Sequence, residues 1–156
     1  MDGMEGDASG SDVVLLAVPN QLVPAALAGV TGLAQQVVID VTNRLDGVDP
    51  PSSYGSVTEY VKAKTGPRSK AFNLNCASLF DQAGTASARR NNIWLGDEDA
   101  RAAVEQLSRD IGMHPFHGGP LEYAATQEAF AFMLVSIVRD LGEGPLFYQF
   151  AAHKEL

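Results

Sequence analysis

The chain has 156 residues, about the usual size of one domain. With 46% hydrophobic and only 19% charged residues it can bury a core, which argues against wholesale disorder. The formal net charge of -8 argues against a nucleic-acid partner, since phosphate binding depends on clustered Lys and Arg.

Hydrophobic patterning and turn residues predict alternating strands and helices along the chain. A leader rich in Gly, Asp and Ser is expected to be flexible over residues 1–12, before one domain over 13–156. The expected strands cover residues 13–18, 36–41, 69–73, 92–96 and 113–117. The expected helices cover residues 21–30, 56–64, 97–111 and 121–141. Such alternation is typical of an α/β fold with a parallel sheet.

Several residues mark how these elements begin, end or pack. The first strand is a continuous apolar run, which predicts a strand covered on both faces. Ser56 and Glu59 have the spacing of a capping box, and Asp97 is expected to cap its helix. Pro115 would confine the last strand to a sheet edge. Gly142 is expected to end the longest helix.

Polar or tightly turning residues follow three of the expected strands. They are Pro19-Asn20, Thr42-Asn43 and Asn73. Open α/β sheets bind ligands beyond the carboxyl ends of their strands, so these residues are candidates for a binding site. The alternative for Asn20 is a helix cap, and the alternative for Asn43 is the start of a turn. Lys70 could face a phosphate or a carboxylate, or could equally point into solvent.

Five segments near these strand ends carry a resemblance to a known family. In chain order they are residues 12–19 (DVVLLAVP), 37–43 (VVIDVTN), 70–73 (KAFN), 96–97 (GD) and 119–121 (GPL). Their order and spacing resemble the deazaflavin-dependent NADP oxidoreductase family, whose fold is also used by the cytoplasmic domains of membrane metalloreductases. The resemblance runs from residue 12 to about residue 150.

This resemblance implies a Rossmann-like, doubly wound and mostly parallel sheet with a long C-terminal helix. It implies hydride transfer between NADP and a deazaflavin, or another acceptor, without a side chain acting as a strong acid or base. The protein would align two rings and exclude water, so no catalytic residue is assigned. The cofactor-binding candidates are Ala17, Val18, Pro19, Asn20, Thr42, Asn43, Lys70, Ala71, Phe72 and Asn73.

The chain departs from the family at its start. The family begins with a strand, a glycine-rich turn and a helix that grip the pyrophosphate, and no G-x-G-x-x-G occurs here. We therefore expect a truncated oxidoreductase that is weakly active or inactive as it stands. A misassigned start, a natural remnant and a deliberately shortened form remain open. The alternative function is a catalytically silent remnant that dimerises or completes its sheet on a partner.

The last helix predicts a subunit interface. The stretch 129–138 is apolar all round, which suits a helix packed on another chain, and the resemblance also implies a dimer. We therefore expect a homodimer through the C-terminal helix. Glu122 and Glu128 on this helix are expected at its surface. His114 and His117 fall on opposite faces of a strand and have no further ligands beside them, so no metal site is expected.

Two features bear on where the protein works. The single cysteine, Cys76, cannot form an internal disulfide, which fits a reducing cytosol, and we expect it as a small buried core residue. No segment has the features of a secretory signal. The longest apolar stretch is interrupted by Ser136 and is too short to cross a bilayer. We expect a cytoplasmic protein without a membrane partner.

Overall fold

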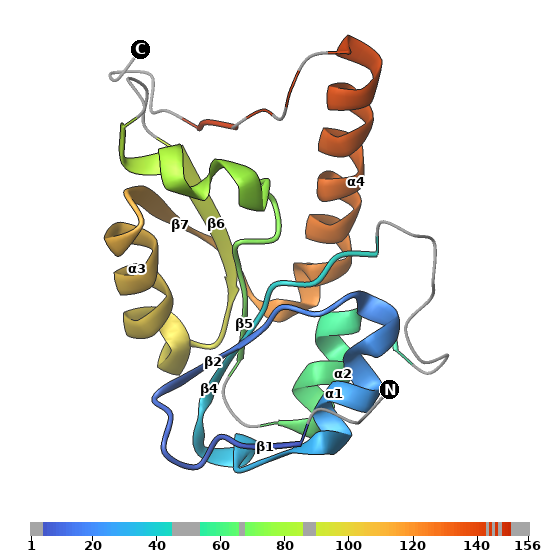
Figure 1. Cartoon of the computed structure of the whole chain (residues 1–156), viewed down its shortest axis with the longest axis vertical. Helices are drawn as coiled ribbons and strands as arrows, with labels where there is room; N and C mark the ends of the chain where they lie inside the picture. The colour runs from blue at the N-terminus through green and yellow to red at the C-terminus, as the bar shows by residue number, and fades with distance from the viewer. Residues whose placement is uncertain are drawn as a thin grey trace.

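The computed structural model describes residues 5–44, 54–65, 68–85, 90–142, 144, 146 and 148–150 (Figure 1). Its strands are β1 (Gly6–Asp7), β2 (Val13–Leu16), β3 (Val30–Thr31), β4 (Val37–Asp40), β5 (Arg68–Lys70), β6 (Arg90–Gly96) and β7 (Met113–Gly119). Its α-helices are α1 (Val23–Gly29), α2 (Val57–Lys64), α3 (Arg101–Asp110) and α4 (Ala124–Leu141). Short 3-10 turns are η1 (Asn20–Leu22), η2 (Leu33–Gln35), η3 (Ala77–Thr85), η4 (Glu98–Ala100) and η5 (Leu121–Tyr123).

One sheet of five strands organises the domain, in the order β2-β4-β5-β6-β7. All neighbours pair in parallel except β5 and β6, which are antiparallel. The predicted α/β class with a mostly parallel, Rossmann-like sheet is therefore confirmed. The expected edge position of the strand that contains Pro115 is also confirmed, because β7 pairs only with β6.

Helices cover both faces of the sheet. In Figure 1, α1 and α2 lie on one side of it and α3 on the other. Side chains of β4 alternate between the two layers: Val38 packs with Val23 and Val61 under α1 and α2, whereas Ile39 packs with Val104 of α3. This alternation is the period of two that a strand imposes on its side chains. The second predicted strand is thus covered on both faces.

The first predicted strand is covered less completely than expected. β2 forms one edge of the sheet, and the side chain of Leu15 is 54% exposed. Leu16, which points to the other face, is buried. The expectation of a strand covered on both faces is therefore wrong for β2, because the face that carries Leu15 is covered only in part: Val13 packs in the cluster under α3, whereas Leu15 stays exposed beside an apolar groove.

The leader is partly built into the fold. Within residues 5–12, β1 pairs in parallel with β3, and Ala8 is buried in the core beneath α1. Asp7 also accepts hydrogen bonds from the backbone N–H and the hydroxyl of Ser9. A flexible leader is therefore not what the structure shows for this stretch, since its backbone has found a strand partner. Residues 1–4 lie outside the described residues.

The helix caps were predicted with mixed success. The hydroxyl of Ser56 accepts the backbone N–H of Glu59 at 3.1 Å, as a capping box requires. Asp97 makes no cap hydrogen bond, because its carboxylate pairs with Lys62 Nζ at 3.6 Å. Asn20 does not cap a helix either, since it lies inside η1 and is buried. Gly142 ends α4 in the left-handed conformation, with φ of 63°.

The C-terminal helix is the longest element. With η5 it spans 21 residues, Leu121–Leu141, which is long and apolar enough to cross a membrane by length and composition alone. Its buried residues lie in its first turns, and its later turns stand beside the chain that follows β5 (Figure 1). The sequence prediction considered only the core of this stretch, so the overall length of the helix reopens the question of a membrane.

Candidate functional site

A cavity of about 370 Å³ opens where β2 and β4 end. Eight residues from the segments after these strands line it: Ala17, Val18, Pro19, Asn20, Gln21, Val41, Thr42 and Asn43. Six of them are predicted cofactor-binding residues. The two segments lie more than twenty positions apart in the sequence, and the parallel pairing of β2 with β4 brings them together. We call this space the strand-end cavity.

The wall of the strand-end cavity contains a hydroxyl without a partner. Thr42 is buried, and its Oγ1 makes no hydrogen bond within the described part of the chain. The Thr42 backbone is fixed, because its N–H donates to Asp40 Oδ1 at 2.9 Å and its carbonyl accepts from Lys70 Nζ at 2.8 Å. A buried polar atom without a partner is costly, so a ligand hydroxyl or amide would be favoured here.

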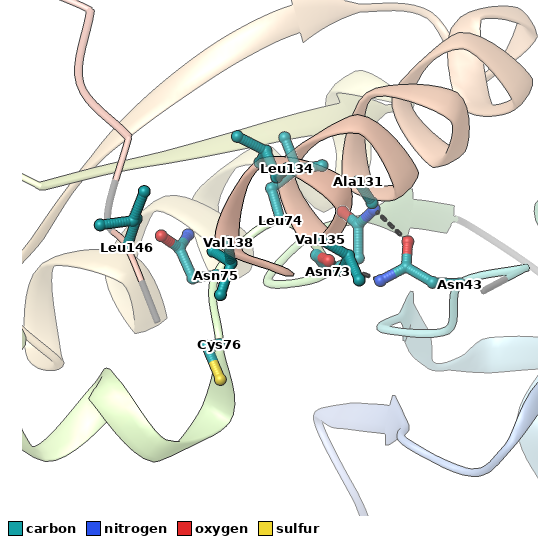
Figure 2. A pocket seen from close by; sticks show the side chains of 10 residues that line it. All are labelled: Asn43, Asn73, Leu74, Asn75, Cys76, Ala131, Leu134, Val135, Val138 and Leu146. Carbon is teal, nitrogen blue, oxygen red and sulfur yellow. Dashed lines mark hydrogen bonds between the residues drawn. The ribbon is translucent and has the colours of Figure 1, made fainter. Parts of the chain in front are cut away.

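A second cavity, of about 240 Å³, adjoins the first and shares Asn43 with it. We call it the helix cavity, because α4 forms one wall (Figure 2). Its other wall follows β5, and none of the described residues that line it is Asp, Glu, Lys or Arg. The lining consists of Asn43, Asn73, Leu74, Asn75, Cys76, Ala131, Leu134, Val135, Val138 and Leu146. Apolar side chains therefore face three amides across this space.

Three amide side chains are linked between the cavities. Asn43 Nδ2 donates to the backbone carbonyl of Asn73, and Asn73 Nδ2 donates to Asn43 Oδ1 at 3.0 Å (Figure 2). Gln127 of α4 donates from Nε2 to Asn73 Oδ1 at 2.8 Å. Neither alternative for Asn43, a ligand contact or the start of a turn, included this pairing, because Asn43 and Asn73 are thirty residues apart.

The backbone at Phe72 adopts a conformation that is rare for bulky residues. Its φ is 60°, in the left-handed region, where such residues are strained by about 1–3 kcal/mol. The Phe72 N–H donates to Asn92 Oδ1 at 3.0 Å, and Asn92 Nδ2 donates to Ser108 Oγ at 2.8 Å. This kink lies directly before Asn73. It therefore sets the direction in which the chain delivers Asn73 to Asn43.

The predicted residues 70–73 do not share one surface. Only Asn73 reaches a cavity of the site. Phe72 instead lines an apolar groove on the face that α3 covers, and Ala71 is fully buried in the same cluster. Lys70 is also fully buried and lines none of the described cavities.

Lys70 belongs to an internal ionic cluster. Its Nζ lies 3.2 Å from Asp40 Oδ2, 3.1 Å from Glu128 Oε1 and 2.8 Å from the carbonyl of Thr42. Thr58 of α2 also donates to Asp40 Oδ2, at 2.6 Å. Lys70 was expected to face a phosphate, a carboxylate or solvent. It faces two carboxylates, and both belong to the protein itself. An ammonium group has three N–H donors, so little capacity is left for a ligand.

Glu128 corrects a prediction, because it is buried rather than at the surface. Its side chain is 4% exposed, and apart from the ion pair with Lys70 neither carboxylate oxygen has a partner with hydrogen-bond geometry among the described residues. Burial raises the pKa of the Glu128 carboxyl, and the nearby charge of Lys70 opposes this rise. Glu122 is exposed, as expected. A helical stripe of Ala124, Gln127, Glu128 and Ala131 was the available signal.

Cys76 is the other correction. The thiol is exposed at the helix cavity, with Sγ 3.2 Å from the hydroxyl of Ser78. The general tendency of cysteine to be buried was misleading, because Cys76 follows the strand end and lies just before η3. Within the described ranges, no group of three or more His, Cys, Asp or Glu could hold a metal ion.

Neither a protein-family model nor a curated protein sequence matches this chain. Solved structures do match. One, provisionally described as a coenzyme F-420-dependent NADP reductase from Arthrobacter sp. FB24, is 21% identical, with a TM-score of 0.77 over 93% of this chain and 72% of its own. A hypothetical protein from Sinorhizobium meliloti is 29% identical, with a TM-score of 0.61 over 76% and 61%. A reductive aminase from Aspergillus terreus, solved with NADPH and ethyl levulinate, is 17% identical, with a TM-score of 0.59 over 85% and 42%.

These likenesses show the fold: the chain shares it with NADP-dependent reductases. It spans less than two thirds of the second and third neighbours.

Proposed function

We propose that the strand-end cavity binds the nicotinamide end of NADP, in an oxidoreductase of the deazaflavin-dependent hydride-transfer type. The observation that carries this proposal is the strand-end cavity itself, where six predicted residues meet around the unpartnered hydroxyl of Thr42. A neighbour described as a reductase of this type and another solved with NADPH support it. The carboxyl ends of parallel strands are also the usual ligand position in such sheets.

The residues present fit the proposed cofactor at its nicotinamide end. Ala17 and Val18 are small enough to let a ring approach the backbone, and Thr42 Oγ1 could bond a carboxamide or a ribose hydroxyl. When bound, the nicotinamide would supply the hydride. The side chains would orient the ring and exclude water.

The helix cavity is the proposed place of the second substrate. It adjoins the strand-end cavity at Asn43, and its α4 wall is apolar (Figure 2). A deazaflavin is the acceptor that the resemblance suggests. The Oδ1 of Asn75, a buried residue of the cavity lining, has no hydrogen-bond partner among described residues and could accept an N–H from such a ring.

We propose that the chain as it stands binds NADP weakly or not at all through the pyrophosphate. The sequence contains no G-x-G-x-x-G, which would offer backbone N–H groups and a helix dipole to phosphate. The nicotinamide side alone would then supply the affinity. We therefore propose an oxidoreductase that is weakly active or inactive as this chain stands.

Nuclear magnetic resonance tests the proposed site on the chain itself. Titration with NADPH should shift the backbone amide signals of Ala17, Val18, Asn20, Thr42 and Asn43 at millimolar concentration. Thr42→Val, which keeps the shape but removes the hydroxyl, should weaken these shifts, whereas Thr126→Val on the exposed side of α4 should not. Absence of shifts around the strand-end cavity would overturn the proposed function. Saturation at micromolar NADPH would overturn the proposal of weak binding.

A second candidate function is a catalytically silent protein that completes its sheet on a partner. β2 leaves its outer backbone edge unpaired in the described sheet. Beside it lies a groove of about 240 Å³ that is lined only by apolar or aromatic residues, namely Leu15, Ala17, Val41, Phe72, Phe80, Leu107 and Ile111. An unpaired edge next to an apolar groove favours strand addition. This candidate predicts no nucleotide-dependent shifts.

We also propose a cytoplasmic homodimer formed through α4. The side of the helix away from the helix cavity exposes large apolar side chains, namely Phe132, Met133, Ile137 and Leu141. Such a patch marks an interaction surface. Light scattering after size exclusion in detergent-free buffer should give twice the mass of the chain, and Ile137→Glu should give the monomer. A wild-type monomer at high concentration would contradict the dimer, and recovery only in the membrane fraction would favour a spanning helix.

A further inference from the structure

The inner and outer faces of α4 have an unusual distribution of polarity. Its buried residues are Ala124, Gln127, Glu128 and Ala131, whereas its large apolar side chains are mostly exposed. A helix docked by the hydrophobic effect alone shows the reverse arrangement. Two small residues allow close approach to the sheet, and two polar residues make the specific contacts. The position of α4 is therefore set largely by Gln127 and Glu128.

Gln127 connects α4 to the amide pair between the cavities. Its Nε2 donates to Asn73 Oδ1 at 2.8 Å and to the backbone carbonyl of Ile93 at 3.1 Å. Asn73 in turn donates to Asn43 Oδ1. One path of contacts thus runs from α4 to Asn43, the residue that both cavities share.

Glu128 connects α4 to Thr42, the residue next to Asn43. Its Oε1 lies 3.1 Å from Lys70 Nζ, which donates to the carbonyl of Thr42 at 2.8 Å. Lys70 also pairs with Asp40, which accepts the Thr42 N–H. Both contacts of α4 therefore converge on residues 42–43, which line the strand-end cavity.

We propose that Glu128 is a positioning residue that acts through Lys70 to hold the Thr42–Asn43 segment in the geometry that the strand-end cavity requires. The inference deepens the proposed function and rests on it, because the position of this segment matters only if the strand-end cavity binds a ligand. It also explains why a carboxylate is buried at a helix position where an apolar residue would pack without cost. Glu128 touches neither cavity, so its role is indirect.

The charged groups around Glu128 define how this device responds to pH. Lys70 of β5 and Asp40 of β4 belong to the same buried cluster, and Arg44 adds a favourable electrostatic contribution to the Glu128 carboxylate. Asp40 accepts hydrogen bonds from Thr42, Thr58 and Lys70, whereas the contact of Glu128 with β5 is its ion pair with Lys70. Protonation of Glu128 would therefore weaken the contact between α4 and Lys70 while leaving these hydrogen bonds to Asp40 in place.

Amide hydrogen exchange tests the proposal without any ligand. In Glu128→Gln, the protection factor of the Thr42 amide should fall about tenfold, as for loss of one charge-assisted contact of roughly 1.4 kcal/mol. The raised pKa of Glu128 means that its protonation favours the folded over the unfolded state, so the test reads the local opening in which Glu128 stays buried. In that opening the protonated carboxyl no longer pairs with Lys70, and the protection of the Thr42 amide should fall as the pH drops through the Glu128 titration. This dependence should be absent from Glu128→Gln. The control Glu122→Gln changes the same chemical group at an exposed position of η5 and should behave as the wild type.

A double variant tests whether Glu128 acts through Lys70. On Lys70→Met, the further change Glu128→Gln should leave the Thr42 protection factor unchanged. If Lys70→Met does not fold, the pH profile of the single variants decides. Unchanged protection and an unchanged pH profile in Glu128→Gln would overturn the inference. Failure of the proposed function is separate: it would show as wild-type protein whose Thr42 signal does not move with NADPH.

Discussion

Asn43 and Asn73 bind each other reciprocally: each donates from its side-chain amide to a carbonyl oxygen of the other. Asn43 follows β4 and Asn73 follows β5, and these are neighbouring parallel strands. This pair forms the partition between the strand-end cavity and the helix cavity. Two proposed substrates would thus meet at a pair of amides whose orientation is fixed.

The first prediction concerns this partition. Asn73→Asp replaces the Nδ2 donor by an acceptor that faces Asn43 Oδ1, so two lone-pair oxygens would be brought together. Urea unfolding should show a loss of about 1–3 kcal/mol. Gln82→Glu adds the same charge at an exposed position and should change stability little. Equal stability of the Asn73→Asp variant and the wild type would show that the pair does not form in solution.

The second prediction concerns the strained residue Phe72. Asn92→Ala removes the acceptor of the Phe72 N–H and leaves that buried donor unpaired, so unfolding should require about 1–3 kcal/mol less free energy. Asn92→Asp keeps this acceptor but loses the donor to Ser108, and it should retain the left-handed backbone. Chemical shifts of the Phe72 carbon atoms measure the backbone conformation. An ordinary strand conformation in the wild type would contradict the assignment.

The third prediction concerns Tyr148, a buried tyrosine that follows the end of α4. Burial raises the pKa of Tyr148 to about 12, although its hydroxyl oxygen accepts the Ile93 N–H, which opposes the rise. In the unfolded chain the tyrosine hydroxyl has its ordinary pKa of 10.0, so it releases its proton first as the pH rises. The free energy of unfolding contributed by this group is therefore complete below pH 10 and is lost between about pH 10 and pH 12.

The control for this titration is Tyr148→Phe. This variant should lack that part of the alkaline loss, measured as the wild-type minus variant difference in unfolding free energy across the pH series. Tyr123→Phe, at an exposed tyrosine, should retain the loss. If the difference in unfolding free energy between the wild type and Tyr148→Phe stays constant up to pH 12, the Tyr148 hydroxyl is not buried in solution.

The fourth prediction concerns the exposed thiol. Cys76 should react fully with a chromogenic disulfide reagent in the absence of denaturant, because it lies at the surface of the helix cavity. A ligand that fills this cavity should slow the reaction, and Cys76→Ser should abolish it. A thiol that reacts only after denaturation would restore the buried position that the sequence suggested.

The local pattern of the chain was sufficient for the elements and the class of fold. Apolar runs, the capping residue Ser56 and the terminating Gly142 are local signals, so the five main strands and the four longer helices were predicted at nearly their observed positions. The edge position of β7 followed from Pro115, because a missing N–H is a property of one residue. The polar strand ends that line the strand-end cavity were found in the same way.

Only the tertiary structure decided which side chains meet, since such meetings depend on residues far apart in the sequence. Glu128 was expected at the surface, and its ion pair with Lys70 joins positions almost sixty residues apart. Lys70, Phe72 and Asn73 are close in sequence but lie in three different environments. Lys70 belongs to the buried ionic cluster, Phe72 lines the apolar groove under α3, and Asn73 lines the helix cavity. Local pattern thus determines what each segment can become, whereas long-range packing determines the environment of each polar group and hence its charge and its role.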